Sequence, residues 1–176
     1  MDQKLAMLLN SPDFSPFGEI PDRFTCEGEN VNPTFNISNV PAGTRSFALI
    51  VDDSDAITPK GPWVHWLIWN IDAESVRSIG DNTVPPGAVQ GINSFGFTGW
   101  AGPCPPTGKR FAHNYRFMVF ALNDFLDLPE GKNKFELEAA MEEKILASAE
   151  LVGKYSRITA SSETELPFPP GAEKSD

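Results

Sequence analysis

Three runs of apolar residues do most to restrict the fold of this 176-residue chain. They cover residues 45–53, 64–70 and 115–122, and apolar side chains occupy both odd and even positions in each run. Successive side chains of a strand point to opposite faces of a sheet, so a strand that is apolar on both faces is covered on both sides. The three runs therefore predict central strands of a sheet that lies between other elements.

The remaining pattern is also dominated by strands. Shorter strands are expected at residues 5–9 and 34–37, and a last strand at residues 155–160. Proline- and glycine-containing turns, such as 41–43 and 85–87, separate the runs. Many strands followed by one helix favour a mainly β protein: an antiparallel β-sandwich, or an α+β fold with the helix packed at one end. No Walker A motif and no strand-following G-x-G-x-x-G is present, which argues against a βαβ nucleotide-binding fold.

A helix is predicted late in the chain. Asn133 can cap its first turn and Glu136 can reach back to Asn133, as in a capping box. Apolar residues then recur at helical spacing, and Gly153 can end the helix. The apolar residues of this pattern are Leu137, Met141, Ile145, Ala149 and Val152.

The length predicts one domain over residues 1–160. Residues 161–176 are polar, acidic and proline-containing, and we expect them to form a flexible tail.

The charge of the chain restricts its partners. A net charge of −10 argues against nucleic acid or an anionic membrane as a general partner. No run approaches the ~20 apolar residues of a membrane helix, so we expect no integral membrane association. No secretory signal is evident, so we expect a cytoplasmic protein. The acidic charge favours a monomer or a weak homodimer. A small anion can still bind where the local charge differs from that of the whole surface.

Two cysteines, Cys26 and Cys104, are present. A cytosolic location predicts two free thiols. A structural bridge between the two is the alternative, and the sequence does not decide between them.

Polar residues gather where the predicted strands end. Asp52 and Asp53 end the first apolar run, and Ser54 and Asp55 follow it. Period-two counting places Asp53 on the face of Phe47 and Val51. A carboxylate on a core-facing position needs a partner. Asp53 and Asp55 are therefore candidate site residues, with a solvated turn as the alternative for this cluster.

Trp63 directly precedes the second apolar run and His65 lies within it, where His65 is expected to share a face with Leu67 and Trp69. A histidine buried in the core with its hydrogen bonds satisfied is the alternative to a ligand-binding one. Three prolines within residues 102–106 fix the backbone of a loop. Gly102 permits close approach of the backbone to a ligand there.

His113 and Tyr115 are expected to share the strand face of Phe117 and Val119. An imidazole and a phenol on one face can donate hydrogen bonds to an oxyanion. A carboxylate, Asp53 or Asp55, would hold the imidazole in its donor form.

Two catalytic alternatives use overlapping residues. Cys104 and His113 could form a thiol–imidazole pair oriented by Asp53. A metal ion could be held by His65, His113, Asp53 and Asp55, although no short spacing pre-arranges these side chains. We predict a protein without catalytic residues, metal or cofactor.

These segments resemble the phosphatidylethanolamine-binding protein family, also called the Raf kinase inhibitor protein family, in its bacterial and archaeal branch. The resemblance runs from about Phe17 to Arg157. It is carried by Asp53-Ser54-Asp55-Ala56, Trp63-Val64-His65-Trp66, Gly102-Pro103-Cys104-Pro105-Pro106 and His113-Asn114-Tyr115-Arg116-Phe117, with further likeness at residues 24–28 and 40–46.

The resemblance implies an antiparallel sandwich with a large central sheet, a smaller second sheet and a C-terminal helix. It also implies a small-anion pocket for phosphate or a phospholipid head group, in a non-catalytic protein that regulates or inhibits another protein. The positions that match the family's pocket are Asp53, Asp55, Trp63, His65, Gly102, Pro103, His113 and Tyr115.

This chain departs from the family pattern at three positions. Ser54 and Ile57 replace two prolines, which predicts a less rigid loop and a changed pocket wall at Ile57. Asn114 replaces a frequent arginine and, by alternation, is expected to point away from the pocket.

Overall fold

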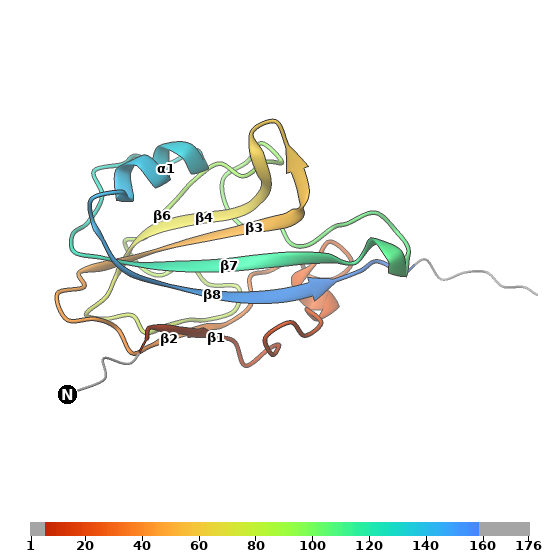
Figure 1. The fold of residues 1–176 in the computed structure, drawn as a ribbon, viewed down its shortest axis with the longest axis horizontal. Helices are drawn as coiled ribbons and strands as arrows, with labels where there is room; N and C mark the ends of the chain where they lie inside the picture. Colours follow the sequence, from red (N-terminus) through yellow and green to blue (C-terminus); the bar gives the residue numbers. More distant parts are fainter. Residues whose placement is uncertain (1–5, 159–176) are drawn as a thin grey trace, which may run out of the picture.

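A computed structural model describes residues 6–158 of the chain. It contains two antiparallel sheets (Figure 1). The larger has the strand order β6-β4-β3-β7-β8, and the smaller has the order β1-β2-β5. The strands are β1 (Leu8–Asn10), β2 (Phe35–Ser38), β3 (Ser46–Thr58), β4 (Gly61–Asp72), β5 (Ser78–Ile79), β6 (Val89–Gln90), β7 (His113–Leu122) and β8 (Ile145–Tyr155). One α-helix, α1 (Lys134–Met141), and two short 3-10 helices, η1 (Asp22–Phe24) and η2 (Lys109–Phe111), complete the described elements.

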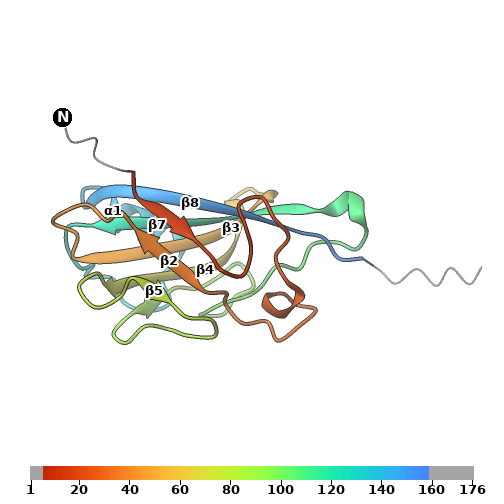
Figure 2. The same cartoon turned by 90° about the horizontal axis from the view of Figure 1, so that it is seen from below.

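The larger sheet is covered on both faces. Helix α1 lies on one face and the smaller sheet on the other (Figures 1 and 2). The core between the sheets includes Phe35, Trp66 and Phe117, whereas the core beneath α1 includes Ile50 and Leu137. The prediction of an antiparallel sandwich with a large central sheet is confirmed.

Strand β3 shows why its apolar run predicts a central strand. Every residue from Ser46 to Asp53 is buried. Phe47 and Val51 enter the core between the sheets, and Ala48 and Ile50 enter the core beneath α1. The expected strands near residues 5–9 and 34–37 are present as β1 and β2, which pair with each other. Leu5 lies outside the described residues.

The predicted helix is shorter in the structure. Asn133 and Glu136 form the expected capping box, but α1 ends at Met141. The helix prediction is wrong from residue 145 to residue 153, because β8 pairs there with β7 along its length. Gly153 ends no helix: it lies in β8, where a Cβ would meet Ile20 and Phe14 at under 3 Å. The last strand predicted at residues 155–160 is also wrong, since β8 ends at Tyr155, and residues 159–160 lie outside the described part.

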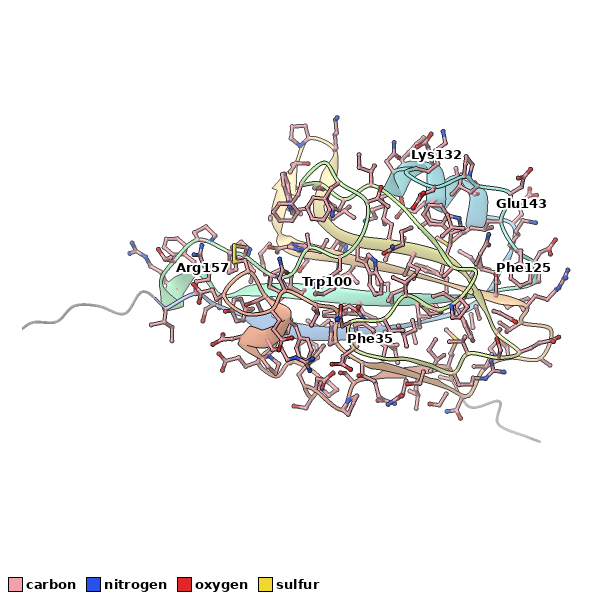
Figure 3. The ribbon with its side chains drawn as sticks, turned by 180° about the vertical axis from the view of Figure 1, so that it is seen from behind. Phe35, Trp100, Phe125, Lys132, Glu143 and Arg157 are labelled. Carbon is pink, nitrogen blue, oxygen red and sulfur yellow. A yellow bond between two sulfur atoms is a disulfide. The ribbon has the colours of Figure 1, made fainter. Side chains whose placement is uncertain are left out.

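The two cysteines are joined in a disulfide, so the prediction of free thiols is wrong. Figure 3 shows the disulfide at the end of the molecule that carries Arg157. The bridge ties the loop after η1 to the proline loop, and Cys26 N also donates to Pro103 O at 3.1 Å. Disulfides are uncommon in a reducing cytosol, and the cytoplasmic location stays a prediction.

The proposed tail, residues 161–176, lies outside the described part of the chain. Within residues 6–158, no helix has the length and apolar character needed to cross a membrane.

Candidate functional site

Five of the eight predicted site residues line one pocket of about 240 Å³, which we call the histidine pocket. They are contributed by β3, β4 and β7, which are neighbours in the larger sheet. Asp53 on β3 lies opposite both Trp63 and Tyr115 in the strand register. The five residues are Asp53, Trp63, His65, His113 and Tyr115.

A β-bulge directs His65 into the pocket. Val51 pairs with Trp66 and Asp52 pairs with Val64, so His65 is the extra residue between two pairs. An extra residue breaks the alternation of side chains and re-aims the strand. The expectation that His65 shares a face with Leu67 and Trp69 is therefore wrong: these two residues lie in the core beneath α1, on the opposite side from the pocket.

Asp53 holds His113. Its Oδ2 lies 2.6 Å from His113 Nδ1, while Oδ1 accepts the backbone N–H groups of Asp55 and Ala56 at 2.9 and 3.2 Å. Asp53 is 3% exposed, and these three contacts compensate the burial of its carboxylate. Since a carboxylate accepts hydrogen bonds, His113 Nδ1 is the donor, as expected for an imidazole oriented by Asp53.

His65 is held by the backbone. Its Nδ1 lies 2.6 Å from Ala101 O, and Ala101 N donates to His65 O at 3.0 Å. Burial lowers the pKa of His65, which favours the neutral ring. A carbonyl oxygen only accepts, so Nδ1 carries the proton and Nε2 is an acceptor.

Tyr115 lies between the two histidines. Its ring packs edge-on against His65 at 5.2 Å and is roughly parallel to His113 at 6.5 Å, between centroids. The Tyr115 hydroxyl is buried and makes no hydrogen bond of good geometry within the described part of the chain, although the Asp53 carboxylate and the backbone of Cys104 lie near it. Burial, and the nearby charge of Asp53, raise the pKa of Tyr115, so the hydroxyl keeps its proton and remains a donor.

Asp55 does not line the pocket. Its Oδ2 accepts from Asn114 N at 2.7 Å and from Asn114 Nδ2 at 2.9 Å. This contact shows that Asn114 points away from the pocket, as alternation predicts, and assigns Asp55 to the outer side of β7.

Gly102 and Pro103 lie behind the pocket wall rather than in it. Gly102 N donates to Asn30 Oδ1 at 2.7 Å, and a Cβ at Gly102 would overlap the carbonyl oxygen of Phe24. The glycine is thus needed for close packing against residues 24–25, rather than for close approach of a ligand. The next three residues of the loop, Cys104, Pro105 and Pro106, line the pocket.

Phe95 completes the pocket, and sequence reasoning missed it. Its ring lies edge-on to Trp63 and His65, at 5.4 Å from each. Buried Asn93 arranges this loop by accepting from Phe95 N at 3.0 Å and donating to Gly99 O at 3.0 Å. No strand pattern covers residues 93–99, so the sequence carries no signal that brings Phe95 to this place.

The departures at Ser54 and Ile57 have local effects. Ser54 Oγ donates to Asn114 O at 3.1 Å, which adds a tie between β3 and β7. Ile57 is 67% exposed and lies outside the pocket lining, so the expected change of the wall at Ile57 is not found. Ala56 lines the pocket at this point.

The catalytic alternatives receive little support. Cys104 is in the disulfide, so it offers no thiol to His113. Among residues 6–158, no group of three or more His, Cys, Asp or Glu side chains is arranged to hold a metal ion.

Comparison with known proteins places this geometry in a family. The family model described as phosphatidylethanolamine-binding protein matches residues 10–156. A UPF0098 protein from Methanothermobacter thermautotrophicus is 42% identical over 155 residues, which cover 86% of this chain and 99% of that protein. A UPF0098 protein from Aquifex aeolicus is 42% identical over 84% of this chain and 86% of its own length.

Two solved structures are similar in fold and sequence. One is a phosphatidylethanolamine-binding protein homologue, CT736, from Chlamydia trachomatis, with a TM-score of 0.78 and 36% identity over 86% of this chain and 98% of that one. The other is E. coli YbcL, described as a member of the mammalian family, with a TM-score of 0.78 and 32% identity over 86% of this chain and 99% of its own. The chain therefore belongs to the phosphatidylethanolamine-binding protein family.

Proposed function

We propose that this protein binds a small anion, phosphate or the phosphate of a head group, in the histidine pocket. The observation that carries the proposal is the Tyr115 hydroxyl, which is buried against the pocket without a partner. An unsatisfied buried hydroxyl costs about 1–3 kcal/mol, so a native fold rarely keeps one without a reason. A ligand oxygen that accepts from this hydroxyl would remove that cost.

The two histidines give the pocket a donor and an acceptor. His113 donates from Nδ1 to Asp53, and in the cationic form of the ring Nε2–H can also donate to the ligand. Neutral His65 uses Nδ1–H on Ala101 O and keeps Nε2 as an acceptor. This pair suits an anion that carries its own O–H, such as hydrogen phosphate. Sulfate has the same shape but no O–H at neutral pH, so we expect the pocket to bind phosphate more tightly than sulfate.

We propose further that the anion belongs to a larger partner, and that the protein regulates another protein rather than catalysing a reaction. An open groove of about 850 Å³ adjoins the pocket and shares Trp63 with it. Phe135 beside this groove is 79% exposed, and Lys60 and Lys134 line it. An exposed apolar surface next to an anion site suits a partner that presents its anion from an extended segment. The disulfide at Cys104 also favours binding over thiol catalysis.

The test is an NMR titration with inorganic phosphate, sulfate and phosphoethanolamine at pH 6.5. We expect saturable shifts at His65, His113 and Tyr115, with phosphate bound more tightly than sulfate. His113→Gln should weaken phosphate binding about tenfold, which corresponds to one charge-assisted hydrogen bond.

Asn114→Ala is the matched control, because Asn114 is the next residue on β7 and points away from the pocket. It should leave phosphate affinity within about twofold. If none of the three anions shifts the pocket resonances at millimolar concentration, the proposal is wrong. Phosphoethanolamine binding that exceeds phosphate binding would identify the head group as the preferred ligand.

A further inference from the structure

A second cavity, of about 280 Å³, lies beside the segment that supports the histidine pocket. We call it the amide cleft. Asn30, Asn82, Thr83, Gln90 and Trp100 are among the residues around it, and Trp100 is labelled in Figure 3. Its volume is several times the ~30 Å³ that one water molecule occupies in the liquid. Asn82 and Thr83 are exposed at its rim, so the cleft is reachable from solvent.

One indole group in the cleft lacks a partner. Trp100 Nε1 is buried and makes no hydrogen bond to any described residue. The ring is held firmly, since it stacks on Phe117 at 6.4 Å and lies edge-on to Trp66 at 5.8 Å, between centroids. Because an indole N–H only donates, the group needs an acceptor that the described chain does not supply.

Two amides add donors to the same cleft. Gln90 Oε1 accepts from Trp66 Nε1 at 2.8 Å, which fixes the amide, and no described residue accepts from Gln90 Nε2. Asn30 Oδ1 accepts from Gly102 N, and Asn30 Nδ2 is likewise without an acceptor in the described chain. In both side chains the amide oxygen therefore accepts a hydrogen bond, while the amide N–H groups have no acceptor among the described residues.

The Asn32 amide, which also lines the cleft, is already fully engaged. Asn32 Oδ1 accepts from Thr83 N at 3.1 Å, and its Nδ2 donates to the carbonyls of Pro33 and Gly80. No charged side chain is among the described residues that line the cleft. The cleft thus offers N–H donors from Trp100, Gln90 and Asn30, and its described lining carries no charge to neutralise an ion.

We propose that the amide cleft binds a small neutral ligand rich in acceptor oxygens, of the polyol or sugar class. Hydroxyl oxygens of such a ligand would accept from Trp100, Gln90 and Asn30. An anion is disfavoured, because the lining carries no cation and the protein has a net charge of −10.

The cleft is chemically distinct from the histidine pocket but lies close to it along the chain. Trp100 lines the cleft, the next residue, Ala101, holds His65, and Gly102 binds Asn30. No described residue lines both cavities, so ligand binding to one cavity can be tested independently of ligand binding to the other.

The test follows the four tryptophan indole N–H resonances while glycerol, glucose or myo-inositol is added. We expect a saturable shift of the Trp100 resonance at millimolar concentration of at least one of these probes. Trp69 is the internal control, because its Nε1 donates to Leu128 O in the core beneath α1, and its resonance should not follow the same curve.

Asn30→Asp sharpens the test. Aspartate keeps an oxygen for Gly102 N but lacks the N–H groups of asparagine, so polyol affinity should fall about fivefold. Phosphate titration of the same variant should still shift Tyr115, which would show that the fold is intact.

Three outcomes would overturn the proposal. The first is a linear shift shared by all four indoles, which indicates a general solvent effect. The second is an unresponsive Trp100 N–H with a strong contact to one long-lived water. The third is a Trp100 shift that saturates with phosphate alone, which would make the cleft an anion site.

Discussion

The chain has two tyrosines, and the structure uses them in opposite ways. Tyr115 and Tyr155 are each only 1% exposed. The Tyr155 hydroxyl donates to Asp22 Oδ1 at 2.8 Å and lies 3.0 Å from Thr25 Oγ1. The Tyr115 hydroxyl has no such partner within the described residues. The Tyr155 hydroxyl thus completes a hydrogen-bonded cluster with Asp22 and Thr25, which we call the Tyr155 corner. The Tyr115 hydroxyl is instead unpaired beside the histidine pocket.

We therefore expect the Tyr155 hydroxyl to contribute to the stability of the fold and the Tyr115 hydroxyl to contribute to ligand binding. At the Tyr155 corner the polar groups satisfy one another, so removing one leaves its partners unpaired. At the histidine pocket, Asp53 engages Nδ1 of His113 and the backbone engages Nδ1 of His65, so the hydrogen bonds occupy only one nitrogen of each ring. The Cys26–Cys104 disulfide joins the two regions, because Cys26 follows Thr25 and Cys104 lines the pocket.

The largest effect is expected when the two regions are uncoupled. Replacing both cysteines, Cys26→Ser with Cys104→Ser, should lower the free energy of unfolding by about 2–4 kcal/mol, because the bridge closes a chain segment of 78 residues. Denaturant unfolding measures this change. Phosphate affinity should also fall, since the wall of the pocket is less firmly held. An unchanged free energy would show that the corner and the wall are stable without the bridge.

The next effect is confined to the corner. Tyr155→Phe should lower the free energy of unfolding by about 1–2 kcal/mol, because Asp22 and Thr25 lose a partner. Burial raises the pKa of Tyr155 to about 12. An unfolded tyrosine ionises near 10, so the folded state binds more protons between these values, and its stability falls as pH rises through that range. In Tyr155→Phe, the loss of stability that Tyr155 causes at alkaline pH should be absent.

A smaller, pH-dependent effect is expected at the pocket. Burial lowers the pKa of His65 below the unfolded value of about 6.5. The unfolded chain therefore takes up a proton first as pH falls, and the stability contributed by neutral His65 is lost below pH 6.5. The stability advantage of the wild type over His65→Gln should shrink between pH 7.5 and pH 5. A constant difference across this range would contradict a buried neutral histidine.

Sequence reasoning recovers the elements in which alternation is unbroken. The two-sided apolar run of β3 predicts a central strand, and alternation along β7 places Tyr115 toward the pocket and Asn114 away from it. Alternation fails at His65, because one inserted residue in β4 changes the sheet face toward which a side chain points without changing the composition of the run. Counting positions in a sequence cannot locate such a bulge.

The other errors come from long-range contacts. The spacing of Met141, Ile145 and Ala149 fits a helix, but pairing with β7 makes residues 145–155 a strand. Tertiary pairing often overrides such a local pattern. The disulfide joins residues far apart in sequence, and the role of Phe95 depends on a loop without regular structure.

The most direct test compares Tyr115→Phe with Tyr155→Phe in one pair of measurements, phosphate affinity and free energy of unfolding. The account predicts that Tyr115→Phe weakens phosphate binding about tenfold, while the free protein is unchanged or more stable by up to about 1 kcal/mol. Tyr155→Phe should show the reverse: lower stability and unchanged affinity. A Tyr115→Phe variant that loses stability and keeps full phosphate affinity would contradict a hydroxyl reserved for a ligand.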